Sequence, residues 1–182
     1  MALVVAAACA VVTPNIALAA QPSPPGASAH AEQEKPTPLL EAATADSSGS
    51  FYTLNPAEYK KATTPANQGG SGFKAKNDAT AADITMFKDQ VPGSVPIYRL
   101  RLKNGHQSYL LSKDPAKEVR PERFDNEGPV GYLYEKQRPG TVALERFSKN
   151  EDWRVAREGR NDLTRAGYGQ DGVLGYFVPQ KK

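Results

Sequence analysis

The sequence predicts a mostly β domain with short helices, built from about three pseudo-symmetric strand–strand–helix–strand units in a trefoil-like arrangement. The first observation is an internal repeat: QVPGSVPIYRL, from Gln90 to Leu100, returns as QRPGTVALERF, from Gln137 to Phe147. The second is composition, because short runs of aromatic and β-branched residues alternate with Gly, Pro, Asn and Asp, as in strands separated by turns. One such unit cannot bury a core alone, so we expect the units to pack around a shared axis.

The first unit, residues 51–91, opens with Phe51-Tyr52-Thr53, which has the composition of a strand. Asn55 and Pro56 then predict a helix start. The asparagine side chain can cap the first turn, and proline loses no hydrogen bond there. Residues 84–87 stand where a third strand is expected. The first strand of this unit is missing, unless the preceding residues supply it.

The second unit, residues 92–138, is the clearest copy. VPIYRLRL (95–102) and SYLLS (108–112) predict two strands, and Asn104-Gly105 between them predicts a tight turn. Asp114 and Pro115 repeat the helix start of the first unit, and GPVGYLY (128–134) predicts the third strand.

The third unit, residues 139–180, repeats this order. Its strands are predicted at VALERF (142–147), WRVA (153–156) and GVLGYFV (172–178), with a short helix that ends near Gly167. Gly131 and Gly175 recur at the same place in the third strand. We therefore expect both glycines to lie beside a strand of the shared core.

The residues before Phe51 are expected to lie outside the folded domain. Residues 2–12 are apolar but too few to span a membrane, and Ala17-Leu18-Ala19 offers a cleavage site. Residues 1–19 are therefore interpreted as a signal peptide, and the chain as secreted. Ala6 stands where a lipoprotein signal has a large aliphatic residue before its cysteine, which argues against a lipid anchor at Cys9. Residues 20–50, rich in Pro, Ala and Ser, are expected to form a disordered linker.

The composition argues against several classes of function. Lysine and arginine total 23 against 20 for aspartate and glutamate, an excess too mild to favour nucleic acid as a partner. No cysteine follows the leader, and His30 and His106 are the two histidines, so we expect no metal site and no cofactor. The G-x-G-x-x-G run at residues 167–172 lacks a following helix, so its glycines are interpreted as turn residues.

The repeated motifs resemble those of a tandem-repeat family of unknown function, found in secreted bacterial and fungal proteins, often beside peptidase or glycosidase domains. The resemblance covers residues 51–179 and is carried by Ile97-Tyr98-Arg99-Leu100, Phe51-Tyr52-Thr53, and Glu127-Gly128 with Gly131-Tyr132. It implies no catalytic residues. The last copy departs from the pattern, because Glu145 replaces the tyrosine of the Tyr-Arg pair and Arg154 replaces the tyrosine of the second strand.

Aromatic residues are the main candidates for ligand contact. Tyr and Trp offer flat, amphipathic surfaces that suit sugar rings or protein partners, and the alternative for each is core packing. The predicted ligand-binding residues are Tyr52, Tyr98, Tyr109 and Trp153.

We therefore expect a secreted, non-catalytic binding module for cell-wall polysaccharide or another glycan. The alternatives are an extracellular protein-interaction or inhibitor domain and, third, a glycoside hydrolase-like enzyme, which needs only two suitably spaced acids. An exposed aromatic strip would favour a glycan, a flat apolar patch a protein partner, and converging carboxylates in a pocket an enzyme.

Arg99 and Arg146 recur at the same place in the repeated first strand. We expect a structural role, in which each guanidinium bonds backbone carbonyls or a nearby acid at the junction between units, with its stem packed on apolar neighbours. Binding of a carboxylate is the alternative, because the planar guanidinium suits that group. Catalysis is not expected, since arginine stays protonated.

Overall fold

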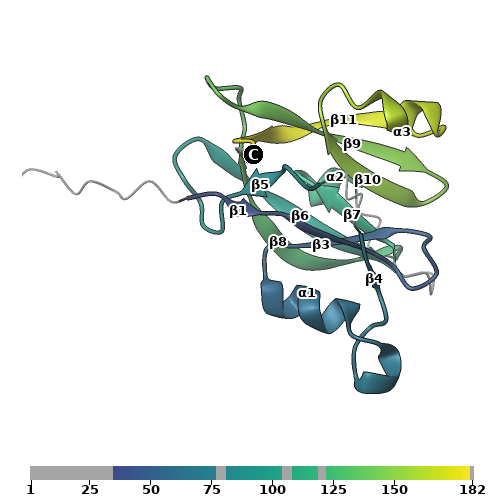
Figure 1. The fold of residues 1–182 in the computed structure, drawn as a ribbon. Coiled ribbons are helices and arrows are strands. Elements are labelled where there is room, and N and C mark those ends of the chain that lie inside the picture. The colour runs from purple at the N-terminus through teal and green to yellow at the C-terminus, as the bar shows by residue number, and fades with distance from the viewer. Residues whose placement is uncertain (1–34, 77–80, 104–107, 119–121, 181–182) are drawn as a thin grey trace, which may run out of the picture. The chain divides into compact units, whose positions relative to one another are not determined.

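The computed structural model describes residues 35–76, 81–103, 108–118 and 122–180. Over these residues the chain is mostly β, with short helices and antiparallel sheets (Figure 1), which confirms the predicted fold class. The trefoil-like symmetry is not tested by the sheet order and stays a prediction. The predicted leader with Cys9, both histidines and the turn at residues 104–105 lie outside the described residues.

The N-terminal part of the fold is a set of short strands with one longer helix. Its elements are β1 (Thr37–Pro38), β2 (Leu40–Ala43), β3 (Ser50–Thr53), α1 (Pro56–Thr63), the 3-10 turn η1 (Ala66–Gln68), β4 (Lys74–Ala75) and β5 (Thr85–Met86). Strand β2 pairs with both β3 and β4, and β1 pairs with β5. Helix α1 begins at the predicted Pro56, with Asn55 as its cap.

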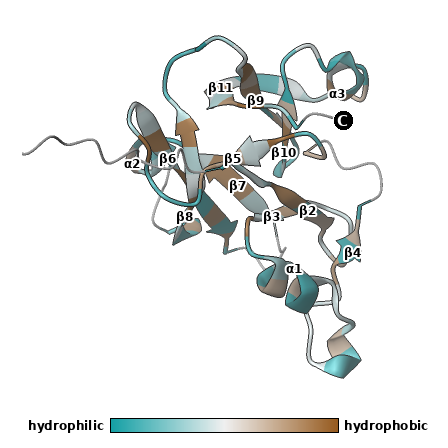
Figure 2. Ribbon diagram, turned by 60° about the vertical axis from the view of Figure 1, so that its left-hand side comes forward, coloured by the Kyte–Doolittle hydropathy of each residue, from teal (hydrophilic) through white to brown (hydrophobic). Residues whose placement is uncertain are grey.

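The predicted linker over residues 20–50 is wrong at its C-terminal end, because β1 and β2 lie within it. Leu39, Ala42 and Ala43 are buried, and β2 is brown, the colour of hydrophobic residues, in Figure 2. Strand β2 takes the place of the first strand of the earliest unit, which could not be identified from the sequence. Its four residues include a glutamate and follow a proline-rich stretch, so composition alone concealed it.

The rest of the fold uses one element order twice. The first series is β6 (Ser94–Leu102), β7 (Tyr109–Ser112), α2 (Pro115–Glu118) and β8 (Phe124–Tyr134). The second is β9 (Val142–Lys149), β10 (Asp152–Arg157), α3 (Asn161–Arg165) and β11 (Gly169–Phe177). In each series the first strand pairs antiparallel with both the second and the third. The strands predicted for these two units are therefore present.

These strands form a sheet of order β10-β9-β11-β8-β6-β7. Its two halves join where Tyr176 of β11 pairs with Tyr134 of β8. A second antiparallel contact of one residue pair, between Phe87 and Tyr132, connects β8 to the segment after β5. The main core cluster draws side chains from strands of all three sheets and from residues next to them, namely Leu39, Tyr52, Leu54, Ala81, Ile84, Met86, Ile97, Leu111, Leu133, Leu144, Val155, Leu174 and Phe177.

Gly131 and Gly175 each face a neighbouring strand at very short range. A Cβ on Gly131 would come within 2.8 Å of the Phe87 carbonyl oxygen and 3.2 Å of the Met86 Cβ. A Cβ on Gly175 would come within 2.9 Å of the Tyr134 carbonyl oxygen and 2.8 Å of the Leu133 Cβ. Both glycines therefore allow the third strand of one series to pack closely on the corresponding strand before it.

Both ends of the folded part meet at β5. Thr37 and Pro38 of β1 pair with Met86 and Thr85 of β5. From the other end of the chain, the Val178 carbonyl accepts a hydrogen bond from the Thr85 hydroxyl, and the Gln180 amide donates to the Asp83 carbonyl at 3.2 Å.

Candidate functional site

Arg99, in the middle of β6, connects three parts of the fold through one guanidinium. Its Nη1 donates to the Tyr52 carbonyl of β3 at 2.8 Å, its Nη2 to Glu58 of α1 at 2.7 Å and its Nε to Glu127 of β8 at 2.7 Å. The side chain is 12% exposed, and the guanidinium lies over the Phe51 ring, 4.6 Å from its centroid. These are the contacts expected of a structural arginine at a junction.

The start of α1 fixes the position of Glu58. The Asn55 side chain accepts hydrogen bonds from the backbone amides of Ala57 and Glu58, which sets the first turn. The Thr53 hydroxyl donates to the Glu58 carboxylate. Partial burial opposes ionisation of Glu58, but the hydrogen bonds from Arg99 and Thr53 outweigh it and lower the pKa of this carboxyl.

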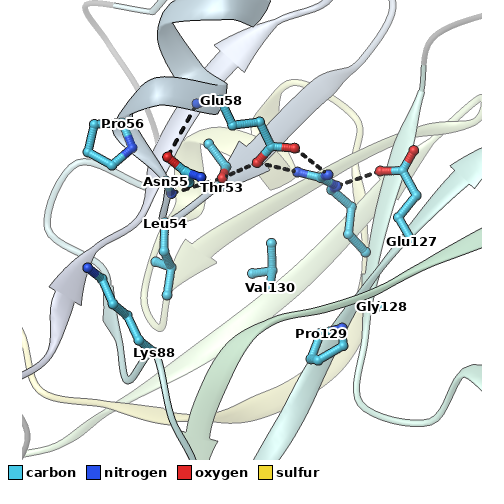
Figure 3. Close-up of a pocket in the computed structure, with 11 residues that line it drawn as sticks. Thr53, Leu54, Asn55, Pro56, Glu58, Lys88, Glu127, Gly128, Pro129 and Val130 are labelled. Carbon is cyan, nitrogen blue, oxygen red and sulfur yellow. Dashed lines mark hydrogen bonds and ion pairs between the residues drawn. The ribbon is translucent and has the colours of Figure 1, made fainter.

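A pocket of about 460 Å³ opens beside this cluster, between the start of α1 and β8. Glu58 and Glu127 both bond the Arg99 guanidinium, and Figure 3 shows Lys88 apart from both acids. Apolar side chains of Leu54, Pro129 and Val130 also line the pocket. The two acids and the two bases in the lining, Lys88 and Arg99, give the pocket no net formal charge.

Arg146 of β9 makes the same three kinds of contact one unit later. Its Nη1 donates to the Leu111 carbonyl of β7 at 3.0 Å, its Nε to Asp171 of β11 at 2.9 Å, and its Nη2 to Glu118 of α2. This side chain is also 12% exposed. A second pocket of about 310 Å³ lies beside it, lined by Lys113, Asp114, Lys117, Glu118, Arg146, Asp171, Gly172, Val173 and Leu174.

The contacts correct one alignment made from the sequence. Arg99 pairs across its hairpin with Leu111, and Arg146 pairs with Val155. Tyr109 pairs with Arg101, and Trp153 pairs with Ser148. Arg101 and Ser148 each lie two residues after the repeated arginine, so Tyr109 and Trp153 occupy corresponding positions. Trp153, and not Arg154, therefore stands in the place of the second-strand tyrosine.

The N-terminal hairpin has an acid in the place of the arginine. Glu41 of β2 pairs with Tyr52 of β3, and its side chain is completely buried. Its carboxylate contacts the ammonium of Lys76 at 3.0 Å, the Ser50 hydroxyl at 2.9 Å and the Tyr52 hydroxyl at 3.4 Å. The Tyr52 hydroxyl also accepts a hydrogen bond from the Val155 amide, so this cluster joins the first hairpin to β10.

Asp152 and Arg154 complete this buried cluster from β10. Arg154 donates to the Ser50 hydroxyl at 2.8 Å and forms an ion pair with Asp152 at 2.9 Å. The Tyr168 hydroxyl donates to the same carboxylate, whose other oxygen is buried and has no hydrogen-bond partner among the described residues. Burial raises the pKa of Asp152 to about 6, and the nearby Glu41 carboxylate adds to the shift.

The aromatic residues predicted to bind a ligand do not form an exposed strip. Tyr52 is completely buried and Tyr109 is 8% exposed, and the Tyr109 ring packs edge-on against Phe51 and Phe73. Complete burial contradicts ligand contact for the Tyr52 ring. Tyr109 also lines a small pocket with Arg99 and Glu127, so its role as a ligand residue stays a prediction. Tyr98 and Trp153 are partly buried against a cluster that contains Phe124, and their role as ligand residues stays a prediction.

Sequence reasoning did not select the four acids that hold the two arginines. Glu58 and Glu118 follow the predicted helix starts, and Glu127 and Asp171 each precede a glycine of the repeated Gly-x-x-Gly-Tyr run. The acids therefore recur together with Arg99 and Arg146, and that joint recurrence was the available signal. Over the described ranges, no group of three or more His, Cys, Asp or Glu residues is arranged to hold a metal, and no helix is long and apolar enough to cross a membrane.

A family model described as Domain of unknown function (DUF5648) matches residues 38–178. The match starts before Phe51, in agreement with the position of β2. No curated protein and no solved structure matches the chain.

Proposed function

The chain belongs to the DUF5648 family, a domain of unknown function. From its pocket geometry we propose that it is an extracellular, non-catalytic module that binds a neutral glycan in the Arg99 pocket. The observation that carries the proposal is a pair of carboxylates, Glu58 and Glu127, held in place by one guanidinium beside an apolar wall. The signal peptide predicted at residues 1–19 supports the extracellular location.

The pocket offers the two kinds of contact that a sugar ring needs. An ionised carboxylate has about four acceptor positions, so Glu58 and Glu127 retain capacity for sugar hydroxyls after bonding Arg99. Pro129 and Val130 offer apolar surface to the C–H groups of the ring. Arg99 is a positioning residue in this proposal, because it fixes both carboxylates before the ligand arrives and so reduces the entropy lost on binding.

The balance of charge in the pocket argues for a neutral ligand. The charges of Glu58 and Glu127 are matched by those of Arg99 and Lys88, so a polyanion or a polycation would gain little net attraction. The volume of about 460 Å³ lies within the range of roughly 300–1,000 Å³ that is usual for small-molecule sites.

Converging carboxylates are also what a glycoside hydrolase would show, so that candidate has a specific observation in its favour. Such an enzyme needs one carboxyl with a raised pKa to act as general acid. Glu58 has the opposite property, because Arg99 and Thr53 lower its pKa. The same arrangement of acids also occurs around Arg146, which suits repeated binding sites better than one catalytic centre.

The proposal is tested with a glycan array followed by calorimetric titration of the best neutral oligosaccharide. We expect Glu127→Gln to weaken binding about 10- to 100-fold, because a hydrogen bond to a charged group contributes about 1.5–3 kcal/mol. Glu135→Gln is the matched control, since Glu135 is exposed and does not line the pocket. Absence of any glycan ligand, or equal affinity for both variants, would overturn the proposal. Release of reducing sugar by the wild-type protein would favour the enzyme instead.

A further inference from the structure

We propose that the pocket beside Arg146 is a second binding site for the same neutral ligand class, so that one chain holds two ligands. This inference rests on the function proposed for the Arg99 pocket. It comes from the equivalence of the two pockets in the structure.

The two pockets are built from corresponding elements. In each, an arginine of the first strand binds a carbonyl of the preceding unit's second strand, an acid on that unit's helix and an acid of the third strand. Both arginine side chains are 12% exposed. The arginine therefore holds an acid of the helix and an acid of the third strand in both pockets.

The second pocket also has no net formal charge. Three acids, Asp114, Glu118 and Asp171, are matched there by three bases, Lys113, Lys117 and Arg146. Asp114 and Lys117 already form an ion pair at 2.8 Å. The same reasoning that selects a neutral ligand for the Arg99 pocket thus applies to this one.

One difference predicts a weaker second site. Lys113 follows Ser112 as Leu54 follows Thr53, and its ammonium donates to the Val173 carbonyl at 2.7 Å. The second pocket therefore has a lysine where the first pocket has a leucine. The smaller volume, about 310 Å³ against about 460 Å³, agrees with this difference, so we expect the Arg146 site to have the lower affinity.

The third junction is not equivalent, so within the part of the chain that the structure describes we expect two sites of this type. Glu41 occupies the place of the arginine and is completely buried. Lys76, Arg154, Ser50 and Tyr52 already contact its carboxylate. A ligand hydroxyl has no access to this group.

The test compares two blocking variants by calorimetry with cellotriose, laminaritriose, maltotriose and chitotriose. Pro129→Trp fills the Arg99 pocket and Val173→Trp fills the Arg146 pocket. We expect a stoichiometry of two for the wild type, one for each variant and zero for the double variant, with the weaker site lost in Val173→Trp. Thermal melts establish that each variant is folded, and Asp171→Asn replaces Val173→Trp if the latter is not.

The outcomes separate the two proposals. A wild-type stoichiometry of one that Pro129→Trp abolishes and Val173→Trp leaves unchanged would overturn the second site and leave the proposed function standing. A stoichiometry of one that only Val173→Trp abolishes would overturn both the paired sites and the Arg99 pocket as the binding site. No binding of any of the four trisaccharides by the wild type would overturn the proposed function itself.

Discussion

Single residues at the junctions hold this fold together through charge. Arg99 and Arg146 each satisfy a backbone carbonyl and two acids, and Glu41 collects donors at the corresponding place in the first hairpin. Isolated ion pairs on a surface contribute little to stability. Partly buried networks behave differently, because the loss of one member leaves the others desolvated and unpaired.

Arg99→Met is expected to lower the free energy of unfolding by about 1–3 kcal/mol, because a partly buried carbonyl and two carboxylates lose their donor. Arg101→Met is the matched control on the same strand, since that side chain is 49% exposed and its loss should change stability by less than about 0.5 kcal/mol. Urea unfolding measures both. Unchanged stability of Arg99→Met together with lost ligand binding would make Arg99 a ligand residue and refute its structural role.

Asp152 is expected to make stability fall as pH rises. Its native pKa of about 6 exceeds the usual value of about 3.9, so between these pH values the native state keeps a proton that the unfolded chain has released. The free energy of unfolding therefore decreases across this window. Asp152→Asn should flatten the decrease, as measured by thermal melts from pH 3.5 to 7.5.

Asp162→Asn is the control for this pH dependence. Arg160 lowers the pKa of Asp162 to about 2, so its contribution to stability is present above the unfolded pKa and is lost as pH falls toward 2. Asp162→Asn should therefore leave the slope between pH 4.5 and 6 unchanged. An identical change of slope in both variants would show that Asp152 is not the group responsible.

Among the elements, the sequence predicted most of the strands and the starts of α1 and α2, because turn chemistry marks them. Asn55-Pro56 and Asp114-Pro115 encode helix starts locally, and the repeated strands carry β-rich composition. Strand β2 could not be found in this way, because its burial comes from pairing with β3 and β4. The pockets were equally hidden, since each brings together residues from three elements that are distant in sequence.

Gly131→Ala is expected to destabilise the protein by about 1–3 kcal/mol, as overpacking does. The added methyl group would meet the Phe87 carbonyl oxygen at 2.8 Å, and the backbone there cannot move without disturbing the bridge to Tyr132. Gly169→Ala is the control in β11, because its Cβ would have no neighbour closer than 3.9 Å. Equal melting temperatures for the two variants would show that the close approach of the strands is not required.

For the molecule as a whole, the position of the domain boundary has a direct test. A chain that begins at Phe51, the boundary predicted from composition, lacks β1 and β2 and removes Leu39 and Glu41 from the interior. We expect it to show no cooperative melt by circular dichroism. A chain that begins at Lys35 should melt as the full-length protein does. A cooperative melt for the shorter chain would restore residues 20–50 as a dispensable linker.

Both ends of the folded part contact β5 and the residues next to it. The segments could therefore pack in the same way if the chain connected them in a different order. Because β1 and residues 178–180 contact the same short segment, a short peptide could join the two ends with little loop entropy to overcome. New ends could then be opened in the exposed residues 135–140 between β8 and β9. Such a circular permutant would keep both arginine junctions while the chain traverses the units in a different order.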